Sequence, residues 1–214
     1  MKTIIEAHLS NMIRKYQGLH VVEQSFNAAI TMLVNCYTQG RKILICGNGG
    51  SAADAEHIVG ELMKAFLKPR PLDSVLLEKI RQQYSCDMLD LSSLQRGIPA
   101  ISLVSGVSLP TAFANDVAGD LCFAQQVLGL AKPGDVVWGI STSGNSRNVN
   151  LALKMAKVLG CHTLGLTGKS GGEMASLVDV ELRVPAENTP DVQELHLPVY
   201  HAICACTEEI VFNY

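Results

Sequence analysis

The chain has 214 residues, of which 48% are hydrophobic and 17% charged, and its formal net charge at pH 7 is −3. This length and composition are typical of one soluble domain with a full hydrophobic core. The mildly acidic balance, without a lysine or arginine run, argues against nucleic acid as a ligand, and no apolar run reaches the roughly 18–20 residues that a membrane span needs.

The first 40 residues are predicted to form an N-terminal helical segment. Apolar positions recur at helical spacing over residues 3–17 and again over residues 21–39, which predicts two helices. Gly40 is a suitable residue to end the second helix.

Short apolar segments follow, and helix-like stretches separate the first four of them. They occupy residues 42–47, 99–105, 135–141, 162–168 and 179–185. Short apolar strands of this kind are typical of a parallel sheet that is covered on both faces. We therefore predict a doubly wound α/β fold, whose strand order the sequence does not give.

Residues 67–98 depart from this alternation. They contain a predicted short helix over residues 74–83 and lie between the first two strand–helix units. We interpret the segment as an insertion that serves as a lid or an oligomer contact, and we expect residues 1–214 to form a single domain.

A last helix is predicted over residues 190–212. Thr189 suits its N-cap, Pro190 the first helical position and Gln193 a capping-box site. Pro198 inside this helix should bend it or force a local break.

The N-terminus alternates charged and apolar residues where a signal peptide would have an apolar core, so we expect a cytoplasmic protein. The seven cysteines are an odd number without CxxC spacing, which favours reduced thiols over disulfides or a zinc knuckle. Six of them lie in apolar surroundings and are expected to be small buried side chains. These are Cys36, Cys46, Cys122, Cys161, Cys204 and Cys206.

The segment GNGGS, residues 47–51, joins an apolar strand to a helix. Its backbone N–H groups are unobstructed by side chains and lie at the positive end of the helix, where phosphate binds readily. The glycine spacing fits neither a dinucleotide site nor a Walker A loop, since no lysine follows Ser51. A monophosphate is therefore the favoured ligand, and a tight turn without a ligand is the alternative.

A second turn of this kind, STSGNS, follows the strand at residues 135–141 and opens a helix at about Asn145. It brings together the hydroxyls of Ser141, Thr142, Ser143 and Ser146. In a parallel sheet both turns lie at the carboxyl edge, where open α/β sheets bind ligands. Hydroxyls and amides can hold a phosphate together; a serine-rich loop with an N-cap is the alternative.

His57 and Glu61 lie four positions apart on the helix after GNGGS, so their side chains share one face and can hold an ion or a substrate together. The alternatives are a histidine buried in the core or an interface, and a Glu61 that pairs with Lys64 or Arg70.

The motifs resemble, in order and spacing, the sedoheptulose 7-phosphate isomerase (phosphoheptose isomerase) family, whose fold is the SIS, or sugar isomerase, domain. The matching segments are CGNGGSAADAEHIVGEL, FANDVAGDLCFAQQV, GDVVWGISTSGNSRNV, LTGKSGG and TPDVQELHLPVYHAICACTEEI. The resemblance covers nearly the whole chain apart from residues 67–98. It implies a five-stranded parallel sheet flanked by helices, a homotetramer with active sites at subunit interfaces, and conversion of sedoheptulose 7-phosphate to glycero-manno-heptose 7-phosphate.

The resemblance also implies roles for single residues. Phosphate and sugar binding fall to Asn48, Ser51, Asp116, Ser141, Thr142, Ser143, Ser146 and Gln193, with the amides of Gly49 and Gly50 beside them. One zinc ion per site would be held by His57, Glu61, Gln193 and His201, and Glu61 and His201 would be the acid–base pair.

The spacing of Gln193 and His201 tests this implied zinc site, because eight residues of regular helix span about 12 Å and one ion cannot easily reach both. Either Gln193 lies in an irregular first turn, or Pro198 bends the helix, or more than one chain builds the site. His196 and Glu194 are nearby alternatives to His201.

The chemistry of aldose–ketose exchange gives each group a task. Glu61 would move the proton beside the carbonyl, His201 would protonate the carbonyl oxygen or assist ring opening, and zinc would act as a Lewis acid. Two other functions stay open: a non-catalytic SIS regulator such as the DnaA-binding proteins, against which Glu61 argues, and an isomerase of another phosphosugar with a pocket reshaped by residues 67–98.

Overall fold

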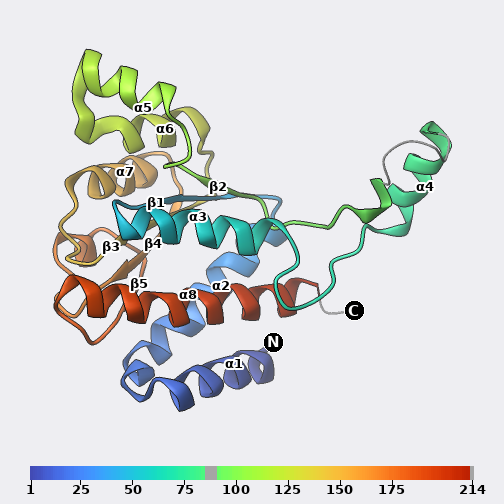
Figure 1. Ribbon diagram of the computed structural model, residues 1–214, viewed down its shortest axis with the longest axis horizontal. Coiled ribbons are helices and arrows are strands. Elements are labelled where there is room, and N and C mark those ends of the chain that lie inside the picture. Colours follow the sequence, from blue (N-terminus) through green and yellow to red (C-terminus); the bar gives the residue numbers. More distant parts are fainter. Residues whose placement is uncertain (85–90, 213–214) are drawn as a thin grey trace.

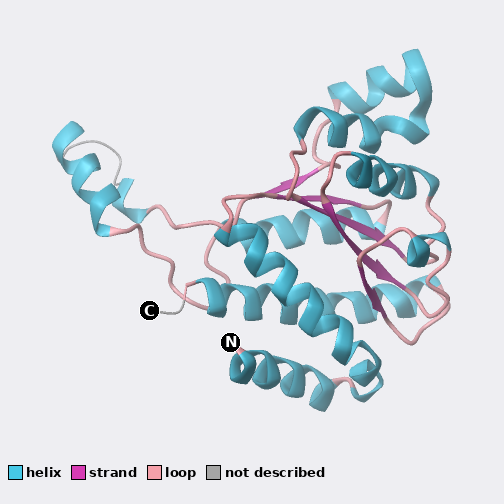
Figure 2. Ribbon diagram, turned by 180° about the vertical axis from the view of Figure 1, so that it is seen from behind, coloured by secondary structure: helices cyan, strands magenta, loops and turns pink. Residues whose placement is uncertain are grey.

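The computed structural model describes residues 1–84 and 91–212. One sheet of five parallel strands runs through the molecule in the order β2-β1-β3-β4-β5 (Figures 1 and 2). The strands are β1 (Ile43–Cys46), β2 (Ala100–Ser102), β3 (Val136–Ser141), β4 (His162–Thr167) and β5 (Val180–Arg183). The predicted parallel α/β fold is confirmed, and the strand order reverses between β1 and β3, which is where sheets of this topology bind ligands.

Eight α-helices lie in the described part of the chain. They are α1 (Lys2–Lys15), α2 (Glu23–Thr38), α3 (Gly50–Met63), α4 (Ser74–Gln83), α5 (Ser108–Phe113), α6 (Cys122–Leu130), α7 (Arg147–Val158) and α8 (Thr189–Val211). Both N-terminal helices and the short helix at residues 74–83 are where the sequence predicts them.

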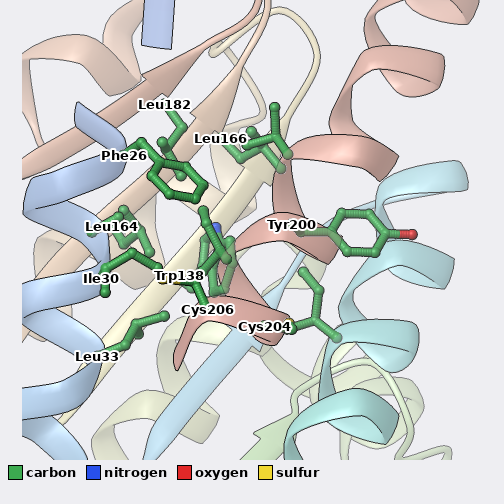
Figure 3. Close-up of a cluster of buried hydrophobic side chains, with 14 of the residues drawn as sticks. Phe26, Ile30, Leu33, Trp138, Leu164, Leu166, Leu182, Tyr200, Cys204 and Cys206 are labelled. Carbon is green, nitrogen blue, oxygen red and sulfur yellow. The ribbon is translucent and has the colours of Figure 1, made fainter. Parts of the chain in front are cut away.

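Alternating strand residues divide the core between the two faces of the sheet. Trp138 and Leu164 point to the face covered by α2, α3 and α8, where they join Phe26 and Leu33 in one buried cluster (Figure 3). Val137 points to the other face, where a second buried cluster joins the sheet to α6 and α7. The sheet is therefore covered on both faces, and α1 packs outside this arrangement against α8 and α2.

The helix ends agree with the sequence only in part. Gly40 has φ +66° and ends α2 as predicted, with its N–H bonded to the Tyr37 carbonyl. The predicted N-cap of α8 is wrong by one residue, because the Asn188 side chain accepts the Asp191 N–H at 3.0 Å while Thr189 is already helical. Of the two effects predicted for Pro198, a bend or a local break, the break does not occur, since α8 continues through it as one helix to Val211.

The part of the predicted insertion at residues 67–98 that contains α4 extends away from the sheet as an arm in both views (Figures 1 and 2). Its helix α4 has an N-cap in Asp73, which accepts the Leu76 N–H at 2.8 Å, and has no buried residue. A bridge between Pro71 and Gln95 joins the two ends of the arm. Residues 85–90 of the insertion lie outside the described part of the chain.

The six cysteines predicted to be buried are all buried and form no disulfide. Burial raises the pKa of the Cys36 and Cys46 thiols to about 12, so these thiols stay protonated at neutral pH. Among the described helices, none combines the length and the apolar character needed to cross a bilayer.

Candidate active site

The glycine turn after β1 is built for close approach to the backbone. Gly49 has φ +56° and precedes the first residue of α3, Gly50. A side chain at Gly47 would lie 2.5 Å from the Ser51 carbonyl oxygen, so only glycine fits there. Ser51 itself is buried in the first turn of α3. The turn thus exposes backbone N–H groups at a helix N-terminus, as an anion requires.

The serine turn after β3 lies beside it, because β1 and β3 are neighbours in the sheet. The Ser141 and Ser146 hydroxyl oxygens are 2.9 Å apart, and the Ser143 hydroxyl accepts the Asn145 N–H at 3.1 Å. Thr142 is half-buried between them. Helix α7 begins two residues later than predicted, with Ser146 as its N-cap residue.

A pair of side-chain amides joins the two turns. Asn48 donates to the Asn148 carbonyl oxygen at 2.8 Å, and Asn148 donates back to Asn48 at 2.9 Å. The sequence motifs place Asn48 in the site but miss Asn148, which lies in the quoted segment GDVVWGISTSGNSRNV without a recognised role. The pair fixes the glycine turn and the serine turn to one another across the switch point of the sheet.

Helix α3, which begins at the glycine turn, runs side by side with α8. Near the turn, a side chain at Gly50 would lie 2.4 Å from the Gln193 amide nitrogen, so Gln193 lies directly against the glycine turn. Further along, the Tyr200 hydroxyl contacts His57. Tyr200 and His57 are 143 positions apart in sequence, as are Gln193 and Gly50. The two helices therefore run parallel with the same offset over this length, and at each of the two contacts one residue comes from each helix.

The far end of this helix pair holds the three other predicted ligands. His57, Glu61 and His201 each offer one ligand atom, and these atoms lie within 4.8 Å of one another. The His57 Nε2 atom is 3.1 Å from a Glu61 carboxylate oxygen and 3.4 Å from the His201 Nε2 atom. The two imidazoles meet edge to face at 86°. Two nitrogens and a carboxylate oxygen that converge in this way suit a divalent cation such as zinc.

The Glu61 carboxylate has an oxygen available to bind a metal ion or a substrate. Its side chain is 13% exposed, and its second carboxylate oxygen is buried without a hydrogen bond. The ammonium nitrogen of Lys64, one of the alternative partners, is 3.9 Å from this carboxylate oxygen, and the Lys64 side chain is mostly exposed. Arg70, the other, donates to the Glu61 backbone carbonyl at 3.0 Å and forms no bond with the carboxylate.

Arg70 instead forms a fully buried ion pair with Glu208 of α8, at 2.7 Å. It also donates to the Leu62 carbonyl at the end of α3, while Glu208 accepts the backbone N–H groups of Phe66, Leu67 and Lys68. The pair thus joins the end of α3, just beyond Glu61, to α8, two turns beyond His201. The sequence signal was a glutamate that follows an apolar run in HAICACTEE, and it was missed.

Burial lowers the pKa of His201, His57 lowers it further, and Glu61 acts in the opposite direction. The imidazole is therefore neutral at neutral pH. On its other side His201 faces the Phe66 ring at 5.5 Å between ring centres. It also lines a cavity of about 260 Å³ to which His8 and Tyr16 of the N-terminal segment contribute.

The alternatives to His201 lie elsewhere. His196 is fully buried, and burial lowers its pKa to about 4. Glu194 is exposed. Asp116 is exposed on the π-helical segment Ala114–Ala118 between α5 and α6, where it accepts a hydrogen bond from the Asn115 amide. Among the described contacts, none joins Asp116 to either turn or to His57, Glu61 and His201.

Two SIS-domain family profiles match the chain, over residues 10–95 and residues 110–205. A phosphoheptose isomerase from Geotalea daltonii is 42% identical over 186 residues, which are 87% of this chain and 84% of the relative. One from Aliarcobacter butzleri is 39% identical and aligned over 94% of this chain and 93% of its own length.

Solved structures agree with these sequence matches. A phosphoheptose isomerase from Neisseria gonorrhoeae superposes with a TM-score of 0.73 at 33% identity, covering 97% of this chain and 98% of the other. One from Francisella tularensis superposes with a TM-score of 0.75 at 29% identity, with 96% of each chain covered.

Proposed function

This chain belongs to the phosphoheptose isomerase family of SIS-domain proteins, and from this premise we propose that it isomerises sedoheptulose 7-phosphate to glycero-manno-heptose 7-phosphate. The reaction is an intramolecular oxidation–reduction, because a hydrogen moves between two neighbouring carbons of one sugar. The observation that carries the proposal is the Glu61 carboxylate beside His201, with one buried oxygen that has no hydrogen bond, on the helix that begins at the glycine turn.

The turns bind the phosphate in this proposal. Amides of Gly49 and Gly50, together with hydroxyls of Ser51, Ser141, Thr142, Ser143 and Ser146, would hold the phosphate and the nearby sugar hydroxyls, with Asn48 and Gln193 beside them. His57 lies six positions after Ser51 on α3, which is about 9 Å along the helix axis. An open-chain sugar with its phosphate at one end and its reacting carbons at the other suits this separation.

Glu61 is the proposed base that removes the proton from the carbon beside the carbonyl and returns it to the neighbouring carbon. His201, held neutral by burial, can donate a proton to the carbonyl oxygen and take one from the adjacent hydroxyl. Binding energy from the distant phosphate positions these carbons against the two side chains.

Zinc is the proposed metal, with His57, Glu61 and His201 as its ligands from one chain. When bound it would supply Lewis acidity to the carbonyl and hydroxyl oxygens of the sugar. Gln193 lies about 12 Å along an unbroken α8 from His201. A role for Gln193 as a fourth ligand therefore needs the Gln193 of another copy.

A homotetramer with active sites between subunits, in the cytoplasm, completes the proposal. The His57 side chain is 43% exposed, although it lies at the centre of the site, and Asp116 is exposed without a partner from the sugar-binding turns. Both features are those of a site that a neighbouring copy completes. Each copy would be a single SIS domain, because residues from both profile matches contribute strands to one sheet.

Substitution of Glu61 by glutamine tests the proposal. We expect ketose-to-aldose conversion to fall at least about 100-fold, because the base is lost, while affinity for the phosphosugar, measured by calorimetry, stays largely intact. Glu56→Gln is the matched control, since Glu56 is exposed on the same helix and accepts only the Ser105 hydroxyl in the described contacts. Full turnover by the Glu61 variant would remove Glu61 from this role.

A panel of ketose phosphates, assayed with and without a metal chelator, separates the remaining possibilities. We expect turnover of sedoheptulose 7-phosphate and its loss on chelation, with recovery on adding zinc. Turnover of hexose or pentose phosphates alone would identify an isomerase of another sugar. Binding without turnover of any of them would identify a phosphosugar-responsive regulator.

A further inference from the structure

Tyr200 connects the hydrophobic core to the candidate metal site. Its ring is 1% exposed and packs in the main core cluster, while its hydroxyl points out of that cluster toward α3 (Figure 3). The hydroxyl oxygen is 3.0 Å from the His57 Nδ1 atom and 3.3 Å from an Asp54 carboxylate oxygen. Asp54 and His57 lie three positions apart on α3, so both side chains face α8.

The single hydrogen of the Tyr200 hydroxyl can go to only one of these two neighbours. An ionised Asp54 can only accept, and its other carboxylate oxygen is already buried without a hydrogen bond. A tyrosine hydroxyl ordinarily has a pKa of about 10, so it keeps its hydrogen at neutral pH. If Tyr200 donates to Asp54, its 3.0 Å contact with the His57 Nδ1 atom is a hydrogen bond only when Nδ1 carries the proton and the tyrosine oxygen accepts it.

The opposite nitrogen of His57 has a competing partner. If the proton were on Nε2, it would be donated to the Glu61 carboxylate oxygen 3.1 Å away. Such a bond would turn the Nε2 proton into the space where Glu61 and His201 converge, and it would occupy the carboxylate oxygen that faces that space. The two sides of the ring therefore compete for one proton.

We infer that Asp54 and Tyr200 are positioning residues that hold the His57 proton on Nδ1 and so direct the free Nε2 electron pair toward Glu61 and His201. This inference rests on the metal site of the proposed function and deepens it. A carboxylate that orients a metal-binding histidine through its second nitrogen is a common arrangement; here a tyrosine from the facing helix stands between the two. The same contact fixes the ring of His57, which meets the Tyr200 ring edge to face at 75°.

The test measures zinc affinity by calorimetry on the full-length protein, with Tyr200→Phe as the main variant. This change keeps the buried ring and removes one oxygen, so the fold should survive, which thermal unfolding of the metal-free protein checks. We expect zinc to bind about 10–100-fold more weakly. Tyr37→Phe is the matched control, because it removes a hydroxyl on α2 that accepts a hydrogen bond from Arg96, and it is expected to leave the affinity unchanged.

The tautomer can also be observed without metal, by long-range ¹H–¹⁵N NMR on protein labelled at histidine, with His57→Gln identifying the signals. We expect the His57 proton on Nδ1 in the wild type and a shift toward Nε2 in Tyr200→Phe. Asp54→Asn should act in the same direction, because its amide can donate to the Tyr200 oxygen and turn the hydroxyl hydrogen toward Nδ1.

Equal zinc affinity in the wild type and Tyr200→Phe, or an Nε2 proton on His57 in the metal-free wild type, would overturn the inference. So would a wild type that isomerises the sugar yet binds no zinc, which would leave the isomerase assignment standing. In the converse case, zinc affinity falls as expected but no phosphosugar is converted. That result would support the inference while the proposed function fails.

Discussion

His196 and His201 lie on one helix but in opposite environments. Five residues turn an α-helix by about 140° beyond one full circle, so His201 faces α3 and the candidate metal site while His196 faces the interior. His196 is fully buried, and burial lowers its pKa to about 4, with the backbone of Thr167 opposing only part of that change. The choice between these two histidines, open from the sequence alone, follows from which side of α8 meets α3.

The buried His196 should make stability depend on pH in a defined window. Between pH 6.5 and about 4 the unfolded chain binds a proton at this residue and the folded chain does not, so the free energy of unfolding falls as the pH falls. We expect urea denaturation to show roughly 2 kcal/mol more loss between pH 6.5 and 4.5 in the wild type than in His196→Gln. The same substitution at the exposed His162 is the control, and parallel curves for the wild type and His196→Gln would contradict the prediction.

At the scale of elements, the site depends on the packing of α3 against α8. The two helices belong to opposite ends of the chain, and their register is maintained at one end by Gln193 against Gly50 and at the other by the buried pair of Arg70 and Glu208. A buried pair of this kind seldom adds much net stability, but removing one partner leaves the other charge uncompensated.

Arg70→Met should therefore destabilise the protein by about 3–5 kcal/mol. Glu208 would remain buried with only backbone N–H donors, and the Leu62 and Glu61 carbonyls would lose the guanidinium that caps α3. Urea denaturation at pH 7 measures the loss, with the exposed Arg81→Met on α4 as the control. A change below about 1 kcal/mol would show that Arg70 does not maintain this contact.

Elements with a local cause were predictable, and those with a tertiary cause were not. The short strands, the helix at residues 74–83 and the facing of His57 and Glu61 follow from periodicity and spacing. The cap at Asn188 was missed because Thr189 offered an equally good local signal. Asp54, Asn148, Tyr200 and Glu208 act across more than 90 positions of sequence, and no local pattern distinguishes them from ordinary polar or core residues.

At the scale of the whole molecule, the arm is the largest departure from the α/β body. It begins shortly after α3 and extends past the ends of α3 and α8 (Figure 1). Apolar side chains on it, such as Val75 and Leu94, are 64% and 57% exposed. Apolar exposure at this distance from the site favours contact with another copy over closure as a lid.

Replacement of residues 72–94 by a short Gly–Ser linker tests this role. The bridge of Pro71 to Gln95 and the Arg96 N–H bond to the Arg70 carbonyl keep the two ends together, so we expect the free energy of unfolding to change by less than about 1 kcal/mol. Light scattering should show a smaller particle than the wild type. An unchanged particle with a raised KM would identify a lid instead.

The glycine turn and the serine turn, proposed to hold the phosphate, contain no lysine or arginine, and Arg147, which follows the serine turn, is paired with Asp120. A dianion would be held there by helix ends and hydroxyls, whose attraction fades within a turn of the helix. A chain of net charge −3 then offers incoming substrate no long-range steering. Capture would depend on direct collision, and its rate would change little with ionic strength.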